Sequence, residues 1–177
     1  ELLSEFAQFT QNLPNSTQQL IINMSQVNFI ASNQFAILGS ILHSLTLSRP
    51  NIEILMQGLQ KNIKNIIGKN GFYKHLNLPN VPDRYNTTIT YKIFKVSEII
   101  EYENYLTINL FNRNDLPKMS IKVRDNIRDY LLEIFKNASD HTQSQYIYTC
   151  GQYFPSSSLL YFTLVDMGET IRYNVDI

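Results

Sequence analysis

Gln19-Leu20-Ile21-Ile22-Asn23-Met24 is a short apolar run between polar residues, and it predicts a buried β-strand. Downstream, apolar residues recur at helical spacing at Phe35, Leu38, Ile41, Leu42 and Leu45. Ser32 or Asn33 is placed to cap this helix, and Pro50 stops it. Residues 52–56 predict a second strand, and residues 60–68 predict a helix that ends near a glycine. This order of elements with short connections predicts a parallel α/β layer.

Residues 76–88 collect Pro, Asn and Asp, which is typical of a loop or linker. Outside the first layer, the patterns predict helices at 1–12, after Ser97 and at 119–140, and strands at 87–94, 145–153 and 159–166. The last two strands are joined by a hairpin signal at 154–158. We therefore expect an α/β protein with one domain at 1–78, a linker at 79–88 and a second domain at 89–177.

The balance of charge restricts the partners. Lys and Arg together number 15, as do Asp and Glu, so no basic excess points to nucleic acid or to an anionic membrane. The longest apolar runs are too short to span a bilayer, and no signal peptide is visible. A single cysteine, Cys150, allows no internal disulfide and favours a reducing compartment. We expect a cytoplasmic protein.

The segment from about 17 to 76 resembles a STAS domain, the fold of anti-sigma-factor antagonists. In that family a strand leads through an apolar motif, here Val27-x-Phe29-Ile30, into a helix that carries a phosphorylatable Asp-Ser-Ser-Gly site. The corresponding residues here are Ala31-Ser32-Asn33-Gln34, with Asn33 at the phosphoacceptor position and Ser32 as an alternative acceptor. Phosphorylation of the family's kind is therefore not expected at Asn33. A generic βαβα layer is the alternative interpretation.

The long predicted helix carries a polar stripe at i, i+4 and i+8, formed by Glu133, Asn137 and His141. An apolar stripe lies beside it and is made of Ile127, Tyr130, Leu131, Ile134, Phe135 and Ala138. A carboxylate and a carboxamide on one helical face can offer a base and an oxygen ligand for Mg²⁺ to the same small volume. The alternative is a solvated polar face on an amphipathic helix.

Residues 130–171 also resemble the front half of the nucleotide site of histidine-kinase/Hsp90-like (GHKL) ATPases. Glu133-x-x-x-Asn137-Ala138 is similar to the N-box of that family. After one hairpin, Asp166-Met167-Gly168-Glu169-Thr170-Ile171 is similar to its Asp-x-Gly-x-Gly-Ile motif. The two motifs occur in the family's order. The resemblance implies a STAS-like layer followed by the N-terminal part of a GHKL α/β sandwich.

The resemblance implies a role for each matching residue. Asp166 would accept a hydrogen bond from the adenine amine, and Gly168 would allow the backbone to approach the ligand. Asn137 would bind Mg²⁺, and Glu133 would act as the general base or orient the nucleophile. Asp140 and His141 lie in the more variable end of the motif. For Asp166 the alternative is a loop-capping aspartate.

Two departures from the family pattern weaken the expected binding. Thr170 stands where the family has its second glycine, and the chain ends before the family's glycine-rich lid motif. We expect ATP and Mg²⁺ as cofactors of the full-length protein and weak or no binding by this chain. The expected function is an ATP-binding regulator of bacterial type, similar to anti-sigma kinases, that acts through a protein partner; a homodimer is left open. The alternative is a non-catalytic interaction module.

Cys150 lies in the hairpin between the two motifs, without a base near it in the sequence. We interpret it as a small buried apolar residue rather than a nucleophile.

Overall fold

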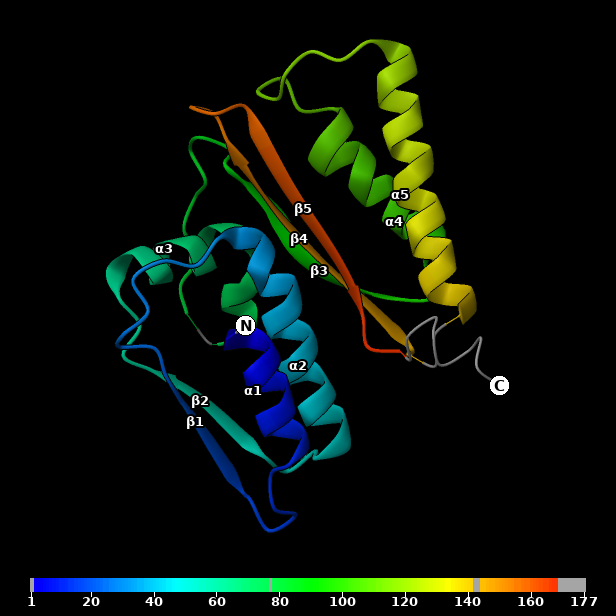
Figure 1. Cartoon of the computed structure of the whole chain (residues 1–177). Helices are drawn as coiled ribbons and strands as arrows, with labels where there is room; N and C mark the ends of the chain where they lie inside the picture. Colours follow the sequence, from blue (N-terminus) through cyan, green and yellow to red (C-terminus); the bar gives the residue numbers. More distant parts are fainter. Residues whose placement is uncertain (1, 77, 142–143, 169–177) are drawn as a thin grey trace.

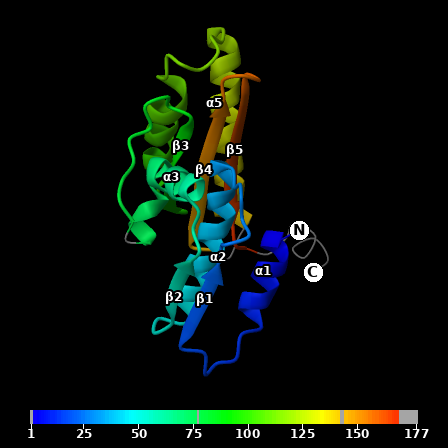
Figure 2. The same ribbon diagram turned by 90° about the vertical axis from the view of Figure 1, so that its left-hand side faces the viewer.

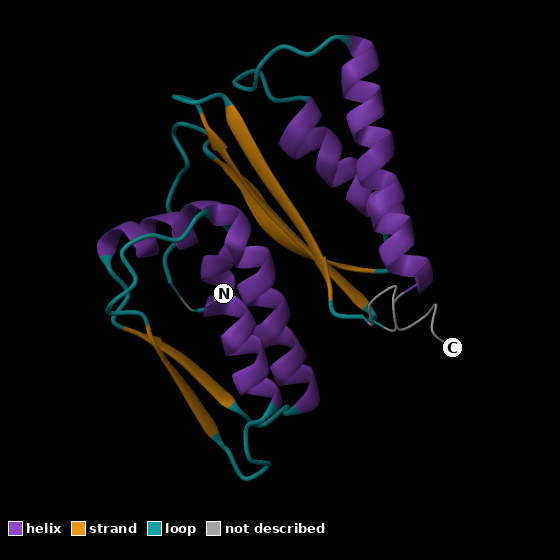
Figure 3. Ribbon diagram, viewed as in Figure 1, coloured by secondary structure: helices purple, strands orange, loops and turns teal. Residues whose placement is uncertain are grey.

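A computed structural model describes residues 2–76, 78–141 and 144–168, which form mixed α/β structure with two small sheets (Figure 1, Figure 3). The first part contains α1 (Leu2–Gln11), β1 (Gln19–Asn23), the 3₁₀ turn η1 (Ser32–Gln34), α2 (Phe35–Ser48), β2 (Glu53–Gln57), α3 (Lys61–Asn70) and the 3₁₀ turn η2 (Phe72–His75). The second contains β3 (Thr88–Lys95), α4 (Ile99–Leu106), the π-helical turn η3 (Thr107–Phe111), α5 (Ile121–His141), β4 (Tyr146–Phe154) and β5 (Leu159–Asp166). The predicted α/β class is confirmed.

The parallel layer predicted for the first segment is present as a two-stranded sheet. β1 and β2 pair in parallel, from Gln19 opposite Glu53 to Asn23 opposite Gln57. α2 connects the two strands, and Leu45 from this helix is buried with Leu20 and Ile52. The apolar face of the helix thus covers one face of the strand pair, as a βαβ unit requires.

The second sheet is antiparallel, in the order β3-β4-β5. β4 lies in the middle, and its residues are buried from Ile147 to Tyr153. Figure 1 shows the reason, because the sheet lies between α2 on one side and α4 with α5 on the other. Figure 2 shows the same order of layers from the side. A strand that is covered on both faces can be apolar along its whole length.

A register shift in β3 divides its side chains between the two faces of the sheet. The pairing with β4 is irregular between Ile89 and Lys92. Ile89 and Phe94 lie in the cluster under α4 and α5, whereas Tyr91 packs in the cluster under α2. A bulge inserts one residue and so changes which face the following side chains reach.

The two predicted domains share a buried cluster. Phe35 and Phe72 from the first segment pack with Tyr91, Tyr148 and Cys150 from the second. The loop at residues 79–87 joins them, as the clustered prolines predict. The division into two domains stays a prediction, and its two parts contact each other through an apolar core.

The predicted helix cap at Ser32 or Asn33 is wrong. α2 is preceded by η1 and has Gln34 at its N-cap, and no side chain caps it. Both residues face the sheet instead. The buried backbone N–H of Ser32 donates to Gln152 Oε1 at 2.6 Å, and Asn33 Nδ2 donates to Thr163 Oγ1 at 3.1 Å. The tertiary partners in β4 and β5 therefore replace the local capping bond.

Among the residues that the structure describes, no helix combines the length and apolar character that a bilayer crossing requires.

Candidate functional site

Phe135 holds α5 on the sheet. It is fully buried, its ring stacks on Tyr102 of α4 with the centroids 4.5 Å apart, and it meets Phe94 of β3 edge to face at 6.1 Å. Ala138, one turn on, is also buried in this cluster. Glu133 and Asn137 lie on the exposed side of the same helix. The packing thus fixes the helix and leaves both predicted site residues open to solvent.

The apolar stripe predicted on α5 divides into two faces. Leu131, Phe135 and Ala138 belong to the core, together with Leu132. Ile127, Tyr130 and Ile134 are exposed by 37%, 65% and 49%. The spacing in the sequence predicts one wide apolar stripe, but only the side with Leu131, Phe135 and Ala138 packs against the sheet.

The end of β5 brings Asp166 to the same sheet face as α5. Phe162 and Leu164 pack against the cluster that contains Phe135, and alternation along a strand places Asp166 on that face too. Asp166 pairs with Ile147, at the start of β4 and shortly after the end of α5. The C-terminal ends of α5 and β5 therefore lie at one end of the sheet, as Figures 1 and 2 show.

The partly buried Asp166 caps its own turn. Its Oδ1 accepts a hydrogen bond from the backbone N–H of Gly168 at 2.9 Å. This contact is the loop-capping arrangement that the sequence left open as the alternative. The other carboxylate oxygen, Oδ2, has no hydrogen-bond partner among the described residues. One carboxylate oxygen therefore supports the turn.

The side chains of Glu133 and Asn137 have no hydrogen bond or ion pair with any other residue in the described ranges. Nor does that part of the chain contain a group of three His, Cys, Asp or Glu side chains arranged to hold a metal ion. Their catalytic and Mg²⁺-binding roles stay predictions. The side chain of His141, and residues Thr170 and Ile171 of the second motif, lie outside the described residues.

The sequence predicts no role for His43 and His75, because they are far apart in the chain. The fold brings both to one cavity between α2 and β3. A signal was present in α2, where Gly39, Leu42, His43 and Thr46 fall at i, i+3, i+4 and i+7 and so share one face. Gly39 and His43 interrupt an otherwise apolar helix face, and this indicates that another side chain packs closely against the helix there.

Cys150 is fully buried, so the interpretation as a small core residue is confirmed. Its Sγ lies 3.3 Å from Ser32 Oγ and 3.3 Å from the carbonyl oxygen of Ile89. Burial raises the pKa of the thiol to about 12, since the thiolate would lose its hydration. Ser32, the alternative phosphoacceptor, is fully buried in the same contact, and a kinase cannot reach its hydroxyl in this conformation.

We expect Cys150 to resist the thiol reagent DTNB in the folded protein near pH 8. Thiolate is the reactive species, and both burial and the raised pKa remove it, so labelling should be about a hundredfold slower than in urea. The absorbance of the released thiolate measures the rate with and without urea. Rapid labelling of the folded protein would contradict the buried position of this residue.

Comparisons with protein-family models, with curated proteins and with solved structures found no match to this chain.

Proposed function

We propose that the chain contributes to an ATP-binding regulatory protein of the GHKL type, which acts through a protein partner. One observation carries the proposal. α5, with Glu133 and Asn137, lies over the sheet face on which β5 ends at Asp166, and the ends of both elements meet at one end of the sheet. This is the order helix, hairpin, aspartate that the two motifs require.

The free oxygen of Asp166 supports its proposed contact with adenine. Oδ2 can accept a hydrogen bond from the exocyclic amine while Oδ1 stays bonded to Gly168. A partly buried carboxylate that already has one fixed bond is held in place before the ligand arrives. An analogue without the amine would leave Oδ2 unpaired, and this gives a preference for adenine.

The donor set on α5 fits Mg²⁺ only together with a nucleotide. Mg²⁺ takes six oxygen ligands, and it usually binds one or two protein oxygens, with phosphates and water as the others. Asn137 offers one carboxamide oxygen, and Glu133 lies one turn away on the same exposed face. In this proposal Asn137 holds the cation, and Glu133 accepts the proton of the attacking nucleophile.

The regulatory part of the proposal rests on how the STAS-like segment docks. Its strand-to-helix turn, η1, contacts β4 and β5 through the hydrogen bonds of Ser32 and Asn33. It lies against the sheet face opposite α5. A change at the nucleotide side can reach this turn through the sheet, so the first segment is the proposed route to the protein partner.

Replacing Asp166 with Asn should weaken the binding of Mg²⁺–ATP about 10- to 100-fold, the usual effect of losing one hydrogen bond to a charged group. Calorimetry or saturation-transfer NMR with the full-length wild-type protein and the full-length variant measures the change. The matched control is Asp129→Asn, which removes an exposed carboxylate from the N-terminal half of α5. Equal binding by the wild type and Asp166→Asn would contradict the adenine contact.

Glu133→Ala should lower the rate of ATP hydrolysis and leave the binding of Mg²⁺–ATP unchanged.

A second candidate is a non-catalytic protein-interaction module, and one feature of α5 favours it. Val123, Ile127, Tyr130 and Ile134 follow the 4-3-4 spacing of a coiled-coil seam, and all four are exposed. Contiguous exposed apolar side chains of this kind often mark a protein interface. If the full-length wild-type protein shows no saturable binding of Mg²⁺–ATP, this candidate is favoured.

A further inference from the structure

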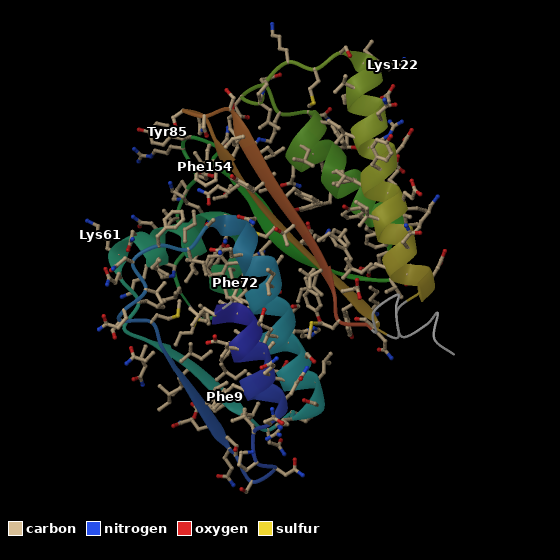
Figure 4. The ribbon with its side chains drawn as sticks, in the orientation of Figure 1. Phe9, Lys61, Phe72, Tyr85, Lys122 and Phe154 are labelled. Carbon is tan, nitrogen blue, oxygen red and sulfur yellow. The ribbon has the colours of Figure 1, made fainter. Side chains whose placement is uncertain are left out.

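A cavity of about 140 Å³ lies between α2 and the three-stranded sheet, on the sheet face opposite Asp166. Most of its wall is apolar, with Leu42 from α2, Ile54 from β2, Phe72 and Leu76 from η2 and its C-cap, and Ile93 from β3. Phe72, labelled in Figure 4, contacts Phe35 of α2 and Tyr91 of β3 at ring distances of 4.9 Å each. The cavity thus lies inside the contact between the two segments.

Tyr91 contributes a hydroxyl group to this wall. Tyr91 is only 6% exposed, and its hydroxyl lies against Gly39, another residue that lines the cavity. No described residue forms a hydrogen bond with this hydroxyl. The neighbouring His43 differs, because its Nδ1 is 2.9 Å from the hydroxyl of Tyr148 and so is already bonded. The hydroxyl is accessible from the cavity, so it is free to form a hydrogen bond with a molecule bound there.

The residues of the wall disfavour a charged ligand. No Lys, Arg, Asp or Glu is among the residues that line the cavity. Burial lowers the pKa of His43. Partial desolvation, with smaller contributions from His43 and Lys74, lowers the pKa of His75, which is exposed at the mouth of the cavity. Both imidazoles are therefore neutral near pH 7 and cannot balance an anion.

We propose that this cavity binds a small neutral aromatic molecule with one hydroxyl group, of the size of phenol, whose hydroxyl bonds with Tyr91. An apolar cavity of about 150 Å³ holds a benzene ring, so the volume suits one ring. The rings of Phe72 and His75 meet Tyr91 edge to face, at 4.9 Å and 5.3 Å, and offer the same geometry to a further ring. The bound molecule contacts both segments and stabilises the contact between them.

Titration with phenol tests the site, with chemical shifts of the protein amides and of the tyrosine and histidine rings as the readout. Wild-type protein should show saturable shifts at Tyr91, Phe72 and His75, and benzoate, which is charged, should cause none. Tyr91→Phe keeps the ring and removes the hydroxyl, so the affinity for phenol should fall about 3- to 10-fold. Ile93→Phe fills the cavity and should abolish the binding.

Tyr102→Phe is the matched control. Tyr102 has a buried hydroxyl without a partner among the described residues, and it lies in the cluster on the other sheet face, away from the cavity. Its replacement should leave the affinity for phenol unchanged. The proposal is overturned if phenol causes no saturable shifts, if Ile93→Phe binds as the wild type does, or if Tyr91→Phe and Tyr102→Phe have equal effects. This result is separate from the binding of Mg²⁺–ATP, which concerns the opposite face.

Discussion

Replacing Phe135 with alanine is expected to lower the free energy of unfolding by about 3–5 kcal/mol. The side chain is fully buried, stacks on Tyr102 and meets Phe94 edge to face. Its removal takes these ring contacts away and leaves a cavity under α5, which the rigid sheet cannot close. Urea denaturation followed by far-ultraviolet circular dichroism measures the loss.

Tyr130→Ala, in the same helix, is the control for this change. Tyr130 is 65% exposed and so contributes little to the core, and the expected loss is within about 0.5–1 kcal/mol. If both substitutions have the same effect, the orientation of α5 described above is wrong. The test also concerns the candidate site, because Phe135 lies between Glu133 and Asn137 and fixes the face of α5 that carries them.

Replacing Gly39 with alanine should destabilise the protein by about 1–3 kcal/mol, although alanine is the better helix former by about 1 kcal/mol. A methyl group at this position would lie 2.2 Å from the hydroxyl oxygen of Tyr91 and 2.5 Å from its Cζ. The ring packs edge to face with Phe72 and His75, so a shift away from the methyl group would disturb both contacts. The sign of the change is therefore opposite to that expected for an exposed helix.

The reason can be isolated in a double-mutant cycle with Tyr91→Leu, which removes the hydroxyl and the ring atoms nearest to Gly39. In this background Gly39→Ala should be neutral or stabilising. The free energy of unfolding of all four proteins gives the coupling between the two positions. A destabilisation of the same size in both backgrounds would show that Tyr91 is not the obstacle.

Local patterns predicted the individual elements well. The strands β1, β4 and β5 follow from short apolar runs, and α2 and α5 from spacing of apolar residues. The packing between them was not predictable in this way. Strict alternation along β3 would place Ile89 and Tyr91 on one face, but the bulge separates them, and that bulge depends on the partner strand. Ser32 likewise stands at a position in the sequence that favours a helix cap, but in the fold its backbone N–H donates to Gln152 of β4.

The candidate sites also differ in how far the local sequence predicts them. α5 and the end of β5 are linked by one hairpin, so their position on one face of the sheet could be predicted from the sequence, whereas a common site of Glu133, Asn137 and Asp166 stays a prediction. The use of Asp166 Oδ1 to close the turn could be named only as an alternative. The cavity with His43, His75 and Tyr91 depends on three distant parts of the chain. Its geometry arises from tertiary packing, which single-residue spacing does not encode.

The apolar cluster shared by the two segments has a consequence for fragments of the protein. A piece that starts at residue 89 would lose α2 and η1 and expose Tyr148, Cys150 and Tyr91 on one whole side of a sheet. Bare sheet faces of this kind favour aggregation over solubility. The segment from residue 89 onward is therefore best produced and studied with its N-terminal layer attached.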